Sequence, residues 1–230
     1  MKKHAIAALL AATVLTLASC GGAGGGDQSD MQGMDHGGSG GDKAQRQDKQ
    51  RGGMAGMDHG EMGADDMASM SRDMVMPNGE YSDKAFIDAM VPHHEGAVEM
   101  AEVAQENAEH AEIKTLAEDI ISAQEAEIDT FGNIRQEKFG SAEGEMEMNE
   151  QDMQAMVMAD PEELAKAEPF DKAFIDDMIP HHESAIAMAE VARKKTDDPE
   201  IRGIANDIVS AQEREIAQMK QWRQQWYPEG

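Results

Sequence analysis

The chain of 230 residues carries 46 Asp and Glu against 20 Lys and Arg, and the resulting formal net charge of −26 at pH 7 argues against nucleic acid as a partner. Aromatic residues make up only 4% of the chain while Met reaches 20 residues, a composition that disfavours a large β-sandwich. The single cysteine excludes an intramolecular disulfide framework and a zinc site built from several cysteines.

The first 19 residues have the pattern of an export signal. Lys2 and Lys3 precede an apolar stretch over residues 5–18, which is too short to span a bilayer as a mature helix. The stretch ends in Leu-Ala-Ser-Cys at 17–20, which resembles the lipobox of bacterial lipoproteins. This resemblance implies cleavage before Cys20, lipidation of its thiol, and a protein anchored to the cell membrane or outer membrane, facing the periplasm or the exterior. The alternative is an ordinary signal peptide followed by a chance free cysteine.

Residues 20–79 are rich in Gly, Asp, Gln, Ser and Met and almost lack Leu, Ile and Phe, which predicts a flexible, disordered tether. A Met-x-Gly-Met-Asp-His-Gly motif occurs at 31–37 and again at 54–60, and five more methionines follow by Met76. Without a core to enter, these oxidisable side chains indicate either metal binding or an accident of composition. The candidate ligands on the tether are Met31, Met34, His36, Met54, Met57 and His59.

The rest of the chain is an internal duplication. Residues 83–128 and 171–216 align without a gap at an offset of 88, with 28 of 46 positions identical. We therefore divide it into a first helical hairpin over 80–138, an acidic, Met-containing linker over 139–169 with room for a short helical piece, and a second hairpin over 170–230.

Each repeat has helical spacing. In the first predicted helix one face is apolar and carries paired histidines, and the opposite face is acidic. The inward residues are Phe86, Met90, His93, His94, Ala97, Met100, Ala101 and Ala104, and the outward ones are Glu95, Glu99, Glu102 and Glu106. Asp83 and Asp171 are the predicted N-caps, and residues 107–112 and 195–199 the predicted turns. Two amphipathic hairpins predict an all-α fold, a four-helix bundle.

Pro92 and Pro180 fall inside the first helix of each hairpin. An interior proline costs about 3 kcal/mol unless the helix kinks, so its position just before two histidines indicates a structural device at a polar site. The alternative is that the helix begins at the proline and that residues 83–91 form a separate turn.

The inward faces carry the candidate metal ligands. His93 and Met100 are seven residues apart and nearly in phase, with Met90 a turn earlier, so one imidazole and two thioethers can converge. The bundle candidates are Met90, His93, His94, Met100, Gln124, Glu127, Met178, His181, His182, Met188, Gln212, Glu215 and Met219. The alternative is a core in which Gln124 and Glu127 simply satisfy His93 and His94, although burying adjacent imidazoles twice is costly. His110, which the second repeat replaces with Asp198, is predicted to be a loop residue without function.

Thioethers and imidazoles together favour Cu(I), and by the same logic Ag(I), over hard cations. Outside the cytosol Met and His also avoid the disulfide formation to which a Cys cluster is prone. The acidic surface adds a general attraction for cations.

The repeat, with Asp-Lys-Ala-Phe-Ile-Asp-x-Met-[Val/Ile]-Pro-His-His-Glu and the later Ser-Ala-Gln-Glu-x-Glu-Ile, resembles domain-of-unknown-function family 305 over about 83–138 and 171–226. The resemblance implies a ferritin-like four-helix bundle in a bacterial envelope protein, and it associates some members with copper binding and copper tolerance. The first repeat departs from the pattern with Phe131 where the second has Met219, so a ligand at that level exists in only one half.

These observations predict an exported, lipid-anchored protein that binds copper, with Cu(I) favoured and Cu(II) or Ag(I) as further ions, for buffering, tolerance or transfer to a copper-handling partner. No enzyme activity is expected. One alternative is a structural or interaction bundle without metal, and another is a di-iron enzyme, although neither repeat has Glu three residues before its inward His. The sequence leaves homodimer formation open.

Overall fold

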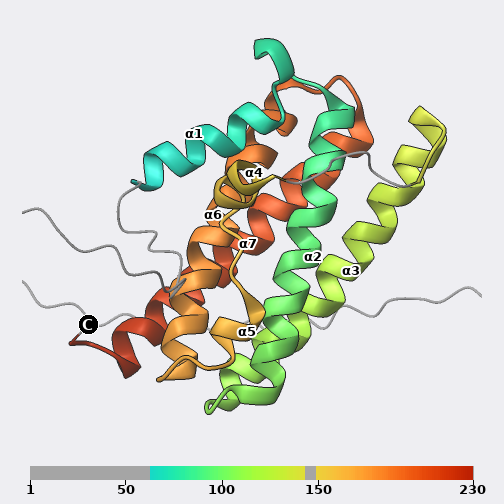
Figure 1. The fold of residues 1–230 in the computed structure, drawn as a ribbon. Helices are drawn as coiled ribbons and strands as arrows, with labels where there is room; N and C mark the ends of the chain where they lie inside the picture. Colours follow the sequence, from blue (N-terminus) through green and yellow to red (C-terminus); the bar gives the residue numbers. More distant parts are fainter. Residues whose placement is uncertain (1–62, 143–148, 230) are drawn as a thin grey trace, which may run out of the picture. The chain divides into compact units, whose positions relative to one another are not determined.

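Four long helices dominate the computed structural model, which describes residues 63–142 and 149–229. They are α2 (Asp83–Asn107), α3 (Ala111–Phe139), α6 (Phe170–Lys195) and α7 (Pro199–Trp226). The pairs α2–α3 and α6–α7 form two hairpins that meet where α2 packs against α6 (Figure 1). The described residues contain no strand. The predicted all-α bundle of two repeated helical hairpins is confirmed.

The duplication is also visible in the packing. Met90 shares a buried cluster with Met188, the counterpart of Met100, and Met100 shares a second cluster with Met178, the counterpart of Met90, so α2 and α6 run antiparallel. The predicted inward face of α2 is buried throughout, and Glu95, Glu99, Glu102 and Glu106 are all exposed. Helical periodicity alone therefore placed the core correctly.

The predicted N-caps are one residue or more out of place. Ser82, not Asp83, is the N-cap of α2, and its hydroxyl accepts a hydrogen bond from the backbone N–H of Ala85. In the second repeat Pro169 takes the N-cap position and Asp171 already lies inside α6. The buried Asp171 carboxylate instead accepts hydrogen bonds from the backbone N–H groups of Glu109, at 2.9 Å, and His110, at 2.8 Å. Its role is therefore to hold the turn of the other hairpin.

His110 packs against the second hairpin, and its prediction as a residue without function stays a prediction. Its Nδ1 lies 2.6 Å from Asp171 Oδ2, and its ring stacks on Trp226 with the centroids 3.8 Å apart. The residue does lie in the turn before α3, but these two contacts join the first hairpin to both helices of the second.

Both interior prolines lie well inside their helices. Pro92 is in α2 and Pro180 is in α6, and each helix begins about nine to ten residues earlier. The alternative in which residues 83–91 form a separate turn is therefore wrong. The burial of Phe86, Ile87 and Met90 in the preceding turns stabilises the helix against the loss of one backbone hydrogen bond.

Four short helices cover the bundle. Helix α1 (Ala64–Met74) packs on α6 and on α4 (Glu150–Ala155), and η2 (Pro77–Gly79) follows α1. Helix α5 (Pro161–Leu164) packs on α2 and α6. The linker thus contains two helical pieces where the sequence predicted one.

Residues 64–79 differ from the predicted flexible tether, because they belong to the folded domain. The Ser71 hydroxyl in α1 donates a hydrogen bond to the Ala155 carbonyl at 2.7 Å, and Val75 is buried. Met74 and Met76 pack against the buried cluster that contains Met90. Methionine and valine supply the apolar surface that the absence of Leu, Ile and Phe had suggested was missing.

Predictions on residues 1–62 fall outside the described part of the chain, including the signal peptide, Cys20 and the two tether motifs. Within 63–142 and 149–229, none of the helices is both long and apolar enough to cross a membrane.

Candidate metal centre

Four imidazoles lie fully buried where α2 and α6 cross. We call His93, His94, His181 and His182 the histidine cluster; each has no solvent exposure. The rings of His93 and His181, one from each repeat, have centroids 3.8 Å apart, and the neighbouring rings within each pair are 6.2 and 6.3 Å apart. Because α2 and α6 are antiparallel copies, the duplication itself brings the two His-His pairs together.

Ser184 is hydrogen-bonded to one ring nitrogen of His93. Its Oγ lies 2.6 Å from His93 Nε2, 2.8 Å from the His181 carbonyl oxygen and 3.3 Å from the Met156 carbonyl oxygen. The hydroxyl has one proton for these three neighbours, so the donor in the bond to His93 depends on the tautomer of the ring. Nδ1 of His93 has no hydrogen-bond partner.

Two carboxylates hold the outer imidazoles. His182 Nε2 lies 2.7 Å from Glu215 Oε2 in a hydrogen bond. In the first repeat His94 Nε2 lies 2.8 Å from Glu127 Oε2, within ion-pair distance although out of line for a hydrogen bond. Glu127 and Glu215 are 24% and 19% exposed, so each connects a fully buried ring to solvent. This is the arrangement in which a carboxylate orients a metal-binding imidazole.

The remaining ring nitrogens have no hydrogen-bond partner. They are Nδ1 of His93 and His182 and both nitrogens of His94 and His181, with His94 Nε2 beside the Glu127 carboxylate. Oε1 of the buried Gln124 and Gln212 is also unsatisfied. Leaving a buried polar atom unpaired costs about 1–3 kcal/mol each, so this density of unpartnered ring nitrogens and amide oxygens at the centre of a bundle fits the binding of a cation there. A cation would satisfy nitrogen lone pairs and amide oxygens alike.

Electrostatics keep the central imidazoles neutral. Burial, followed by the other histidines of the cluster, lowers the pKa of both His93 and His181 well below the ordinary value of 6.5. In each case a backbone contact with the other residue of this pair opposes the shift. Neutral imidazoles have free lone pairs, which is the protonation state a metal ion requires.

The predicted methionines are divided between the two buried clusters. Met90 and Met188 belong to one, and Met100, Met178 and Met219 belong to the other. Because ten residues of helix span about 15 Å, Met90 and Met100 cannot bind one ion together with His93. The expected convergence within one repeat is therefore replaced by pairing between repeats.

The position of Phe131 makes the two halves unequal. Its ring centroid lies 5.9 Å from that of His94, while the equivalent Met219 is fully buried in the other cluster. A thioether at this level is present only in the second repeat, as the sequence comparison of the repeats indicated.

Sequence reasoning missed three residues around the cluster: Ser184, Met156 and Met158. Ser184 is aligned with Gly96 in the repeat, and this mismatch was an available signal. Met156 and Met158 are in the linker, which the internal alignment does not cover. Across the described ranges, no three His, Cys, Asp or Glu side chains form a preformed metal site. Thioethers are the other abundant soft donors in the bundle core.

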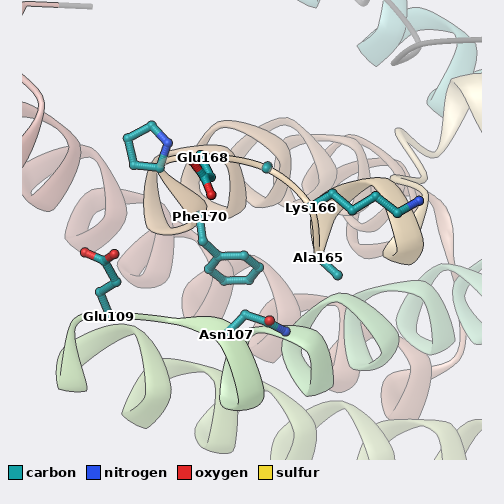
Figure 2. A pocket seen from close by; sticks show the side chains of 8 residues that line it. Asn107, Glu109, Ala165, Lys166, Glu168 and Phe170 are labelled. Carbon is teal, nitrogen blue, oxygen red and sulfur yellow. The ribbon is translucent and has the colours of Figure 1, made fainter.

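A surface pocket lies away from this centre. Figure 2 shows it between the turn after α2 and the segment joining α5 to α6, with the Phe170 side chain at its wall. Its lining contains no His, Met or Cys, so it lacks the donors of a soft-metal site. The lining residues are Asn107, Glu109, Ala165, Lys166, Ala167, Glu168, Pro169 and Phe170.

Comparison with known proteins identifies the family. The family described as "Domain of unknown function (DUF305)" matches residues 23–135 and 83–223. The chain belongs to this family. Among solved structures it is similar to CopM in its Cu(II)-bound form, with 41% identity and a TM-score of 0.60, and in its Cu(I)-bound form, with 40% identity and a TM-score of 0.57. Each comparison covers 64% of this chain and 99% of CopM, which is also known in a Ag-bound form.

Two further relatives extend the comparison. A DUF305 fragment from Deinococcus radiodurans is 25% identical, with a TM-score of 0.54 over 60% of this chain and 91% of the fragment. An uncharacterized protein, L153, of Acanthamoeba polyphaga mimivirus is 43% identical over 49 residues. That match spans 21% of this chain and about a third of the viral protein.

Proposed function

We propose that this protein binds Cu(I) at the histidine cluster and buffers copper, or passes it on, at the cell envelope. The observation that carries the proposal is the set of buried ring nitrogens without hydrogen-bond partners. A purely structural core would satisfy these atoms, because buried polar groups in native proteins are nearly always paired. No catalytic step is part of the proposal.

The surrounding donors favour a soft ion. Neutral imidazoles and the thioethers in the two buried hydrophobic clusters are ligands for Cu(I) and Ag(I), whereas Mg²⁺ and Ca²⁺ prefer oxygen. CopM, with about 40% identity, binds Cu(I), Cu(II) and Ag, which supports copper for this chain and adds Cu(II) and Ag(I) as further ions. The net charge of −26 raises the local concentration of any cation.

The location and the tether are part of the same proposal. The lipobox-like residues 17–20 support export and attachment of Cys20 to a membrane lipid. The Met-Asp-His motifs at 31–37 and 54–60 would then capture copper near the membrane and deliver it to the bundle. A copper-handling partner protein is the expected recipient.

Competition titration tests the proposal directly. Bathocuproine competes with the apo protein for Cu(I) under reducing, anaerobic conditions, and we expect a dissociation constant tighter than micromolar. The variants His93→Ala/His94→Ala and His181→Ala/His182→Ala should each weaken binding. The control His110→Ala removes a histidine outside the cluster and should leave the affinity unchanged. Binding no tighter than micromolar by the unmodified protein would overturn the proposal.

Thermal melting separates copper binding from a structural role. A ligand present at about 100 times its dissociation constant stabilises the native state by about 2.7 kcal/mol. We expect the melting temperature to rise with Cu(I) and to return on adding a Cu(I) chelator. A melting curve unaffected by either addition would support the alternative of a structural or interaction bundle without metal.

A further inference from the structure

One buried position distinguishes the two halves of the histidine cluster. The repeats place Gly96 and Ser184 at equivalent positions. Ser184 supplies a hydroxyl that is hydrogen-bonded to His93 Nε2 at 2.6 Å, whereas Gly96 has no side chain to offer His181. As a result both ring nitrogens of His181 are without a hydrogen-bond partner, and unlike His94, whose Nε2 lies 2.8 Å from the Glu127 carboxylate, His181 has no carboxylate in ion-pair contact among the described residues. We call the space left by the missing side chain the Gly96 notch.

The linker fills the Gly96 notch with a thioether. A Cβ atom built on Gly96 would lie 2.6 Å from Met158 Sδ and 3.7 Å from His181 Nε2. Met158 therefore occupies the space that the serine side chain occupies in the other half. Its sulfur and Nε2 of His181 therefore both lie within 4 Å of one point, the Cβ position of residue 96.

The linker is held in this position by contacts on both sides. The Ala155 carbonyl accepts a hydrogen bond from the Ser71 hydroxyl at 2.7 Å, and the Met156 carbonyl oxygen lies 3.3 Å from Ser184 Oγ. Between them and Met158 the buried Val157 has a φ of 53°, a left-handed conformation that is unfavourable for a β-branched residue. Such strain persists where the surroundings demand it, and here it directs the chain so that Met158 reaches the notch.

A sulfur beside an unpartnered imidazole has a chemical use. A thioether accepts hydrogen bonds only weakly, so it does not replace the hydroxyl as a partner for His181. A thioether and an imidazole nitrogen are, however, both lone-pair donors to Cu(I). Resting on the proposed function, we propose that Met158 Sδ and His181 Nε2 are ligands of one soft cation. The linker thereby completes a metal site in one half of the histidine cluster, and Ser184 blocks the equivalent site in the other half.

The competing explanation is packing alone, in which Met158 only fills the space above a glycine. Two substitutions in the full chain separate the explanations. Met158→Leu keeps an apolar side chain of similar volume and removes the sulfur. Gly96→Ser forces the flexible end of Met158 away and offers His181 a hydroxyl, which copies the arrangement at Ser184. Met153→Leu, in the same linker, is the matched control.

Cu(I) affinity is measured by bathocuproine competition, and the sulfur ligands are counted by X-ray absorption at one equivalent of Cu(I). We expect Met158→Leu and Gly96→Ser each to weaken binding by about tenfold or more, the scale on which even indirect contacts to a metal ligand act. Both should lose a sulfur scatterer, and Met153→Leu should match the unmodified protein. Far-UV circular dichroism and a melting curve of the apo variants establish that they fold.

The outcomes separate this inference from the proposed function. If the unmodified protein binds no Cu(I) more tightly than micromolar, the proposed function fails. If it binds Cu(I) tightly and Met158→Leu keeps the same affinity and sulfur count, only the role of Met158 is overturned. If a variant does not fold, an NMR spectrum of the unmodified protein with ¹³C-labelled methionine methyl groups tests the same role. There the Met158 methyl signal should shift with the first equivalent of Ag(I), and an unmoved signal would equally refute the role of Met158.

Discussion

Lowering the pH should destabilise the apo protein well before its carboxylates titrate. His93 and His181 have folded-state pKa values well below 6.5, because they are buried beside other imidazoles. Below about pH 6.5 the unfolded chain binds a proton at each site that the folded chain does not, so the free energy of unfolding falls as pH falls. At about pH 5.5 the loss is about 1.4 kcal/mol per histidine, or about 3 kcal/mol for the two, relative to about pH 7.5.

Urea denaturation of the apo protein at a series of pH values measures this loss. In the double variant His93→Gln/His181→Gln, the free energy of unfolding should change less with pH over the same range. A free energy of unfolding that stays constant from about pH 7.5 to 5.5 in the unmodified protein would refute the argument that these two imidazoles are buried and neutral.

Two further predictions use the duplication and the surface as internal controls. Asp88→Asn breaks an ion pair with the buried Arg135 and should lower the free energy of unfolding, measured by urea denaturation, by about 3–5 kcal/mol. The equivalent Asp176→Asn, in a partly exposed pair, should lower it by less than about 1 kcal/mol. Equal losses would contradict the role assigned to burial. Glu215→Gln removes the charge that orients His182 and should weaken Cu(I) binding about 10- to 100-fold by competition titration, while the exposed Glu213→Gln should not change it.

The helices and their inward faces could be predicted because burial along a helix follows from local spacing. Every inward residue predicted on α2 is buried, and the paired histidines lie at its centre. The helix starts were less accurate. Asp171 is a residue type that often caps helices, but its carboxylate binds a turn far away in sequence, and no local sequence pattern predicts such a contact.

The parts of the site that could not be predicted depend on which helix packs against which. Periodicity placed Met90 and Met100 on one face, but the antiparallel crossing of α2 and α6 assigns them to different clusters. Met158 is a clearer case, because its position follows from how the linker crosses the bundle. The folding of residues 64–79 was missed because methionine was counted as a ligand and not as core material.

The antiparallel pairing of α2 with α6 has a further consequence. Two separate copies of one hairpin, joined as a symmetric dimer, would have to carry the same residue at both positions now held by Gly96 and Ser184, and the same residue at those of Phe131 and Met219. Fusing the copies into one chain removes that constraint, since each half can then change alone. The two halves can therefore differ in the group beside each central imidazole, which is the Ser184 hydroxyl for His93 and the Met158 sulfur for His181.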